Sequence, residues 1–167
     1  MILWRFWLYS FLGYLLEKAF AAATASPHQT RKCFLLLPLC PVYGLAVLAV
    51  LALPPTLRDG FWRLAFWGGA AATAVEYAVH WLYERGLGVQ FWDYSALPGN
   101  VRGRVCLPFS IMWVLLLAAG LPCAEENLVP LLERVPPLAT YGLLLVFTAD
   151  AVCSVRFLQV TRDVDAL

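Results

Sequence analysis

Residues 91–107 read Phe-Trp-Asp-Tyr-Ser-Ala-Leu-Pro-Gly-Asn-Val-Arg-Gly-Arg-Val-Cys-Leu, and this is the longest polar passage of an otherwise apolar chain. Proline, glycine and asparagine favour turns, so no helix of membrane length can run through the passage. Two interpretations stay open: a long solvated loop between two spans, or an ordered loop that closes a site between helices. We expect an ordered loop in which Asp93 bonds Arg102, Arg104 or nearby backbone N–H groups.

Composition indicates an integral membrane protein. The 167 residues are 62% hydrophobic and 14% charged, and the mean hydropathy is +0.72. Soluble domains are typically about half apolar and about a quarter charged. The net charge of +1, without a basic tail, does not indicate nucleic-acid binding. The chain has no P-loop, Ser-centred triad motif or dinucleotide fingerprint, so we expect no cofactor, and any ATP hydrolysis would belong to another chain.

Five cysteines lie mostly in or beside apolar runs and form no C-x-x-C pair: Cys33, Cys40, Cys106, Cys123 and Cys153. This pattern favours buried thiols over a disulfide framework.

Five apolar runs approach or reach the length of about 20 residues that crosses a bilayer. They cover residues 2–25, 33–53, 61–83, 105–121 and 138–160. We therefore predict an all-α fold: a polytopic transmembrane bundle of five spans, forming one domain over residues 1–167. The first run continues past Glu17 without a small-residue cleavage site, so we interpret it as a retained span. An acidic connection that ends at Pro136-Pro137 precedes the fifth span.

The second run contains two prolines in its first half. Pro38 and Pro41 are followed by Tyr43 and Gly44. Because proline lacks an N–H and clashes with the preceding turn, we predict a break in this span between Leu37 and Gly44. A plain proline kink in a packed bundle is the alternative.

Short loops on the cytoplasmic side of a membrane carry an excess of Lys and Arg. With five spans, one side holds seven such residues and the other four: Arg31, Lys32, Arg85, Arg102, Arg104, Arg156 and Arg162 against Arg5, Arg58, Arg63 and Arg134. This bias places residues 84–104 and the C-terminus in the cytoplasm and the N-terminus outside.

Three acidic residues lie inside predicted spans at one depth. Counted from the cytoplasmic ends, Glu17, Glu76 and Asp150 are each roughly 12–15 Å from the boundary. A carboxylate at this depth is costly unless it is paired, protonated or wetted. We predict that the three share one polar site, with Glu76 the most important and Glu84, at the membrane edge, of little importance. The alternative is that each acid pairs separately for packing.

Glu76, His80 and Glu84 are spaced four residues apart and share a helix face. Glu and His at this spacing could bind a metal, but the chain has only two histidines and no further convergent ligand. We predict no metal site.

Several motifs carry a resemblance to a known family. They cover roughly residues 8 to 120 and are Gly13-Tyr14-Leu15-Leu16-Glu17, Pro38-Leu39-Cys40-Pro41-Val42-Tyr43-Gly44, Glu76-Tyr77, Trp92-Asp93-Tyr94-Ser95 and Asn100-Val101-Arg102-Gly103-Arg104-Val105-Cys106-Leu107. In these motifs the chain resembles the putative ABC-transporter permease type IV family of small bacterial membrane proteins. The resemblance implies a transport role in the inner membrane, and names no substrate.

Three functions remain open. The first is a permease subunit or small-solute or ion carrier, which with only five spans predicts a homo-oligomer or partner subunits, including a separate ATPase subunit. The second is a membrane-embedded enzyme acting on lipids, in which Asp93 or Glu76 is acid or base and Arg104 clamps a phosphate. The third is a non-catalytic scaffold or regulatory subunit.

We favour transport, expect membrane lipids as partners, and assign no catalytic residue. The candidate site residues for a substrate or ion are Glu17, Tyr43, Glu76, Tyr77, His80, Asp93, Tyr94, Asn100, Arg102, Arg104 and Asp150.

Overall fold

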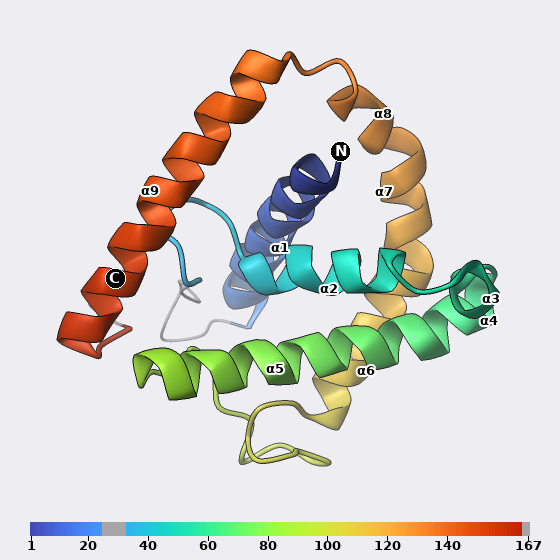
Figure 1. Ribbon diagram of the computed structural model, residues 1–167. Helices are drawn as coiled ribbons and strands as arrows, with labels where there is room; N and C mark the ends of the chain where they lie inside the picture. Colours follow the sequence, from blue (N-terminus) through green and yellow to red (C-terminus); the bar gives the residue numbers. More distant parts are fainter. Residues whose placement is uncertain (25–32, 165–167) are drawn as a thin grey trace.

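The computed structural model describes residues 1–24 and 33–164, and the regular elements in these ranges are all helices (Figure 1). Apart from the helices, the described residues contain one isolated antiparallel bridge, between Val101 and Val105. The all-helical prediction is confirmed for this part of the chain. The loop with Arg31 and Lys32, used to predict orientation, lies outside the described residues.

The first two helices pack closely. Helix α1 spans Ile2–Ala23 and helix α2 spans Pro41–Leu51. Gly13 of α1 lies so close to the ring of Tyr43 that a Cβ atom there would overlap it. The N–H of Cys40 donates to the carbonyl of Ser10 across the same interface, at 2.9 Å. The contact depends on small residues at the crossing.

Residues 33–40 are not helical, so the predicted span 33–53 is helical only from Pro41. Proline is favoured in the first turn of a helix, where its missing N–H has no intrahelical partner to lose. The backbone amides of Leu36 and Leu37 bond instead to Asp150 of another helix. Pro41 thus begins a short helix of 11 residues instead of kinking a long one.

The next helical run extends from residue 61 to residue 87. After the short α3 (Pro55–Arg58), it consists of α4 (Phe61–Arg63), a π-helical turn η1 (Leu64–Gly68) and α5 (Gly69–Leu87). The run ends at Gly88, whose φ of 70° is left-handed. Glycine favours this position because it has no Cβ to clash. The helix therefore continues past the predicted end at residue 83.

The fourth run extends well beyond its predicted end. It consists of α6 (Leu107–Leu115), a π-helical turn η2 (Leu116–Gly120), α7 (Leu121–Asn127) and α8 (Val129–Leu132). The acidic stretch interpreted as a connection is therefore largely helical, which corrects the prediction. Pro122 and Pro130 stand in the first turns of α7 and α8, where proline is compatible with a helix.

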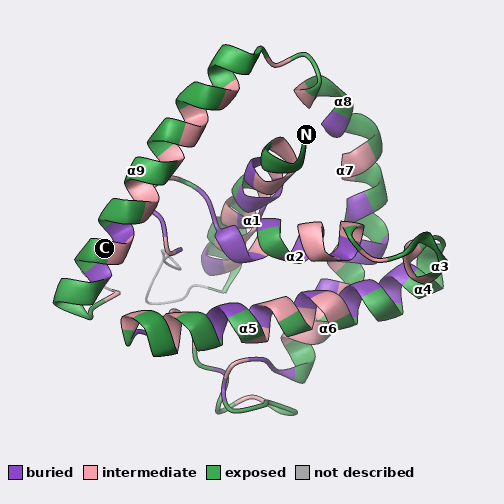
Figure 2. Ribbon diagram, in the orientation of Figure 1, coloured by how far each residue is buried: buried purple, intermediate pink, exposed green. Residues whose placement is uncertain are grey.

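The last helix, α9 (Pro137–Thr161), lies along one side of the molecule (Figure 1). Side-chain contacts join it to α1: the indole N–H of Trp4 donates to the hydroxyl of Thr140 at 2.9 Å, and the ring centroids of Phe6 and Phe147 are 5.6 Å apart. Most of its length is exposed, as Figure 2 shows. In a bilayer these exposed apolar residues would meet lipid tails or another protein.

The main core forms where α1, α2, η1, α5 and the α6–η2 run meet. Its buried residues are Tyr9, Ala46, Val47, Val50, Leu64, Ala72, Trp113, Leu117 and Leu121. Figure 2 shows buried positions on the facing sides of α1, α2 and α5.

By length and hydropathy, two helical runs of the described residues could cross a membrane: Leu107–Leu132 and Pro137–Thr161. Two is fewer than the five spans predicted. Helix α1 and the run over residues 61–87 are long enough, but charged and polar residues lower their hydropathy, and α2 is short.

Candidate functional site

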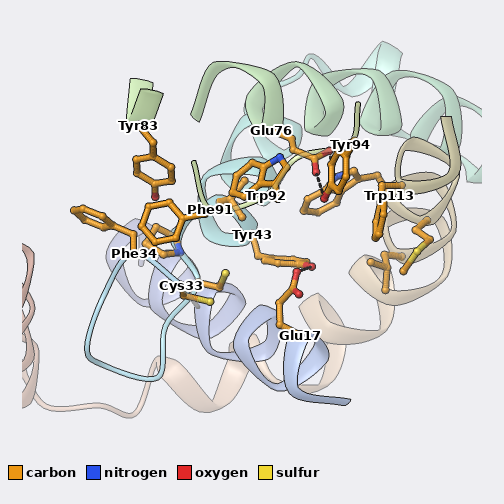
Figure 3. A pocket seen from close by; sticks show the side chains of 16 residues that line it. Glu17, Cys33, Phe34, Tyr43, Glu76, Tyr83, Phe91, Trp92, Tyr94 and Trp113 are labelled. Carbon is orange, nitrogen blue, oxygen red and sulfur yellow. Dashed lines mark hydrogen bonds between the residues drawn. The ribbon is translucent and has the colours of Figure 1, made fainter. Parts of the chain in front are cut away.

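A cavity of about 60 Å³ lies among α1, α2, α5, α6 and the polar loop over residues 91–106 (Figure 3). A space of this size holds a few water molecules or a small solute. The residues that line it come from α1, from the start of α2 and the segment before it, from α5, from the polar loop and from the α6–η2 run: Glu17, Cys33, Phe34, Cys40, Pro41, Val42, Tyr43, Glu76, Tyr83, Phe91, Trp92, Tyr94, Phe109, Met112, Trp113 and Leu116.

One wall of the cavity is a carboxylate–phenol pair. The hydroxyl of Tyr43, on α2, donates to the carboxylate of Glu17, on α1, at 2.7 Å. Tyr43 is the third residue of α2, so the helix start at Pro41 determines where its side chain lies. The start of α2 at Pro41 therefore positions one of the two polar groups of the cavity.

The opposite wall is built around Glu76 of α5, whose side chain is buried, at 6% exposure. Its two carboxylate oxygens accept from the hydroxyl of Tyr94, at 3.2 Å, and from the indole N–H of Trp113, at 3.0 Å. Tyr94 belongs to the polar loop and Trp113 to α6. One carboxylate thus joins three segments that are far apart in the sequence.

Aromatic rings connect the two walls. The rings of Tyr43 and Trp113 have centroids 4.9 Å apart, so the partners of the two carboxylates are in contact. Tyr94 stacks on Phe109 at 4.7 Å, with an interplanar angle of 15°. Stacked and tilted aromatic pairs stabilise packing beyond the area they bury.

The polar loop over residues 91–106 contains a tight hairpin. Val101 and Val105 pair as a bridge, with the N–H of Val101 donating to the carbonyl of Val105 at 3.0 Å. Of the three residues between them, two are left-handed: Arg102 has a φ of 55° and Gly103 a φ of 69°, and the N–H of Arg104 closes the turn on the carbonyl of Val101 at 3.1 Å. Two residues with positive φ match the tight hairpin turn that follows the twist of paired strands.

A side chain reinforces this hairpin from inside the loop. The amide nitrogen of Asn100 donates to the carbonyls of Ser95 and Leu97, at 3.0 and 2.9 Å. Its oxygen accepts from the N–H of Gly103 at 3.2 Å. Asparagine therefore acts here as a local backbone brace.

The loop is docked on α5 at Trp92, whose backbone carbonyl and ring both contact His80. His80, buried at 3% exposure, has its Nε2 atom 2.9 Å from the carbonyl of Trp92. The indole N–H of Trp92 donates to the carbonyl of Arg104 at 2.9 Å. Because a carbonyl only accepts, Nε2 of His80 must carry the proton in this contact.

Arg104 forms the second docking point. Its guanidinium donates to the carboxylate of Glu84 at 2.7 and 3.1 Å and to the hydroxyl of Tyr77 at 2.6 Å. It also lies over the Tyr77 ring, 5.0 Å from the centroid, within the range of a cation–π interaction. The prediction that Glu84 is of little importance did not foresee this pairing.

Asp93 bonds locally. Its carboxylate accepts from the N–H of Ser95 at 2.8 Å and from the hydroxyl of the same residue at 2.9 Å. These two hydrogen bonds lower the pKa of Asp93. The hydrogen bond from Arg104 likewise lowers the pKa of Glu84 and raises that of Arg104.

Asp150 lies apart from the cavity. Its two carboxylate oxygens accept from the backbone N–H groups of Leu36 and Leu37, at 3.2 and 3.0 Å. The hydroxyl of Ser154 is 3.4 Å from one of the same oxygens. Depth along the membrane normal was estimated from residue counts, but it does not determine which way a side chain faces.

The predicted site residues thus separate into four groups. Glu17, Tyr43, Glu76 and Tyr94 line the cavity, and Tyr77, His80, Asp93, Asn100 and Arg104 hold or dock the loop. Arg102 is exposed at the hairpin turn, and Asp150 stabilises the backbone before α2.

Sequence reasoning missed Trp113, because a tryptophan inside an apolar run is typical of ordinary packing. It also missed a polar cluster at the other end of α1. There Arg5 donates to the carboxylate of Glu125 at 2.8 Å, and the hydroxyl of Tyr9 donates to the same carboxylate at 2.8 Å. The assignment of Glu125 to a loop hid this contact, which needs α7 to be helical.

Across the described residues, no three side chains of the His, Cys, Asp and Glu types converge as metal ligands do. In the same part of the chain none of the five cysteines forms a disulfide, and Cys33, Cys40 and Cys106 are buried.

Comparison with known proteins gives one family. The family model described as Putative ABC-transporter type IV matches residues 4–155. Neither the curated proteins nor the solved structures provide a match.

Proposed function

The chain belongs to the Putative ABC-transporter type IV family, and from this membership we propose that it is a membrane transport subunit whose solute or ion site is the cavity between Glu17 and Glu76. The family name concerns transport but names neither a solute nor a partner. The choice of site rests on geometry.

One observation carries the proposal: two carboxylates from different helices line one cavity in the interior of an apolar helical bundle. Acidic side chains at such depth mark ion and substrate pathways in many membrane proteins. A scaffold would also bond its acids, as Glu17 and Glu76 are bonded here. However, a scaffold needs no cavity between them, and close packing would fill one.

The proposed topology has five membrane segments. The segments in the bilayer would be α1, α2 with the non-helical residues before it, residues 61–83 of the next run, the α6–η2 run and α9. Glu84 would lie at the membrane edge. Irregular backbone at membrane depth is tolerated where protein satisfies it, and Asp150 does so for Leu36 and Leu37. With the N-terminus outside, the polar loop would cover the cavity from the cytoplasmic side.

Partners follow from the same proposal. Five segments make a thin wall for a transport pathway, so the chain would assemble with copies of itself or with other subunits. Helix α9, with large exposed apolar residues such as Leu138, Leu145 and Val160, offers a surface for lipid or for such a contact. An ATPase, if ATP drives transport, would be a separate chain, because this one contains no P-loop.

Thermal unfolding in a maltoside detergent, measured with a panel of inorganic ions and small cationic, neutral and anionic solutes, tests the site. We expect at least one solute to raise the Tm of the wild type by several degrees, as binding to the folded state must. Glu17→Gln and Glu76→Gln should abolish the shift.

Glu126→Gln is the matched control, because Glu126 is an exposed glutamate outside the cavity. It should keep the wild-type shift. If no solute stabilises the protein, or if Glu76→Gln and Glu126→Gln respond alike, the cavity is not a solute site.

A further inference from the structure

A long apolar groove lies on the surface of the molecule between α5, the hairpin of the polar loop and α6. Its volume is about 700 Å³, and it shares no lining residue with the cavity. Ala70 and Ala74 line it from α5, Val101 and Val105 from the hairpin, and Ile111 from α6. The loop that carries the hairpin lies below α5 in Figure 1. The alanines are exposed, so the groove is open to whatever surrounds the protein.

The length of this groove matches one leaflet of a bilayer. Along the helical run it extends from Phe66 to Tyr77, which at about 1.5 Å per residue corresponds to about 16 Å. The hydrocarbon core of a bilayer is about 30 Å thick, so one leaflet is about half of that. An apolar groove of this length accommodates an acyl chain of a phospholipid.

The two ends of the groove differ in polarity. At one end the hydroxyl of Tyr77 accepts from Arg104, whereas Phe66 and Val114 form the other end. Trp81 follows Tyr77 by one helical turn and is exposed, as is typical of tryptophan at a membrane–water interface. A phospholipid has the same division, with a polar head at one end and apolar chains behind it.

Two arginines at the polar end have no acidic partner. Arg102 lies at the hairpin turn, two residues before Arg104, and Arg85 directly follows Glu84 on α5. Because Arg104 and Glu84 bond each other, Arg102 and Arg85 both lie within two residues of the same ion pair. Both are exposed, and neither forms an ion pair with any residue that the structure describes. Their guanidinium groups are therefore available to an anion.

The acidic residues nearby do not cancel this charge. Glu84 is engaged by Arg104, and Asp93 accepts from the N–H and the hydroxyl of Ser95. The charged residues between positions 84 and 104 are three arginines and two acids: Arg85, Arg102 and Arg104 against Glu84 and Asp93. The excess is positive, and arginine binds phosphate through paired N–H groups.

We propose that an anionic phospholipid binds this groove, with one acyl chain between α5 and α6 and its phosphate at Arg102 and Arg85. The site goes beyond the proposed function, because its ligand is a bound lipid and not the transported solute. In the proposed topology the phosphate lies at the cytoplasmic surface of the membrane, where anionic lipids are concentrated.

Phosphatidylglycerol and phosphatidylcholine with the same acyl chains test the site, because they differ in net charge but not in their chains. The purified full chain in maltoside is titrated with each lipid, and with glycerol 3-phosphate as a head group without chains. Native mass spectrometry counts the bound lipids, and the Tm is measured in parallel. We expect one phosphatidylglycerol per chain and a Tm raised by several degrees, binding of phosphatidylcholine weaker by about fivefold or more, and no effect of glycerol 3-phosphate.

Charge variants test the head-group contacts. Arg102→Gln and Arg85→Gln should each weaken phosphatidylglycerol binding by about fivefold and leave phosphatidylcholine binding unchanged, since each removes one positive charge beside the phosphate. Arg134→Gln is the matched control, because Arg134 is also exposed but lies after α8, outside the groove. It should bind both lipids as the wild type does.

Groove-filling variants test the acyl-chain contacts. Ala74→Leu and Ala70→Leu place a larger side chain at exposed positions that line the groove, and each should weaken the binding of both lipids. Ala119→Leu, at an exposed position of η2 outside the groove, is the control and should leave both unchanged. The Tm without lipid shows whether each variant is folded.

Four results would overturn the inference. Equal binding of the two lipids, or equal phosphatidylglycerol binding in Arg102→Gln, Arg85→Gln and Arg134→Gln, would reject recognition of the head group. Stabilisation by glycerol 3-phosphate as large as that by phosphatidylglycerol would assign the arginines to a soluble anion. A dimer in maltoside that becomes monomeric in Ala74→Leu would show that a second copy fills the groove. None of these results concerns the cavity, which Glu76→Gln tests separately.

Discussion

The guanidinium of Arg104 lies 2.7 Å from the carboxylate of Glu84, which precedes it by 20 residues in the chain. The same guanidinium donates to the hydroxyl of Tyr77 and lies over its ring. One side chain of the loop therefore engages two residues of α5 that lie about two helical turns apart. Only 12% of the Arg104 side chain is exposed, against 40% of the Glu84 side chain, so the guanidinium end of the pair is the protected one.

Replacing Arg104 with Lys should loosen the polar loop. Lysine keeps the charge but loses the planar fork that meets both oxygen partners and the ring. We expect amide hydrogen exchange across residues 92–104 to become several-fold faster, with little change in α1. Arg102→Lys is the control, because Arg102 is exposed at the turn, and it should leave exchange outside the turn unchanged. Unaltered exchange in Arg104→Lys would mean that the docking does not depend on this contact.

Acidification should also release the loop. Hydrogen bonds from Arg104 and from Ser95 lower the pKa values of Glu84 and Asp93 below their ordinary values of 4.5 and 3.8. A carboxyl group with a lowered pKa in the folded state contributes stability that is present above its ordinary pKa and is lost as the pH falls below it. The Tm should therefore be insensitive to these groups near neutral pH and should fall below about pH 4.5.

The double variant Glu84→Gln/Asp93→Asn isolates this effect. Its Tm should be lower than that of the wild type at pH 7, and the two curves should converge as the pH falls. Parallel curves would contradict a role for these two carboxylates in the acid sensitivity.

The loop shows what the sequence can predict and what it cannot. The turn-forming residues Pro98, Gly99, Asn100 and Gly103 predict a local structure, because turn geometry depends on dihedrals and nearby bonds. Docking on Glu84 was not predictable in the same way, since it depends on the direction in which α5 presents its side chains. The helix also had to continue past residue 83, and only Gly88 ends it.

The acidic residues inside the predicted spans also show which part of the site the sequence predicts. Residue counting along a helix estimates depth, and Glu17 and Glu76 indeed line one cavity. Residue counting does not determine how each helix is rotated about its own axis. Asp150, at the same estimated depth, therefore bonds the backbone of Leu36 and Leu37 outside the cavity. The helix over residues 121–132 was missed for a different reason. Its prolines, which usually indicate a break, stand in first turns where they are compatible with a helix.

Gly13→Ala should destabilise the contact between α1 and α2. An added methyl group would overlap the ring of Tyr43, which is half-buried and packs against Trp113, so it cannot easily move away. Overpacking of this kind typically costs about 1–3 kcal/mol. Because Tyr43 carries the hydrogen bond to Glu17, ligand binding at the cavity should weaken as well. Gly142→Ala on α9, where nothing lies near the added methyl group, should have no such effect in unfolding experiments.

Asp150→Ala should destabilise the fold through the segment before α2. It removes the acceptors of two backbone N–H groups, and an N–H left unpaired in the bilayer, where the proposed topology places this segment, costs about 1–3 kcal/mol. Asp150→Asn keeps one oxygen acceptor and should cost less. Proteolysis or hydrogen exchange over residues 33–40 would detect the loss locally. If Asp150→Asn and Asp150→Ala behave alike and leave this segment unchanged, the hydrogen bonds to Asp150 do not stabilise it.

Cysteine labelling in whole cells tests the orientation, which rests on the bias of seven against four Lys and Arg residues. In a background with the five native cysteines replaced by Ala, we would introduce Ala96→Cys in the polar loop and, separately, Thr56→Cys in α3. Both positions are exposed, and neither side chain takes part in the hydrogen bonds that hold the loop. Gly88, just before the loop, is less suitable for labelling, because its φ of 70° would strain a cysteine.

With the N-terminus outside, an impermeant maleimide should label Thr56→Cys in intact cells and should label Ala96→Cys only after the membrane is permeabilised. The reverse pattern would place the loop outside, and the cavity beneath it would then open toward the opposite side of the membrane from the one proposed.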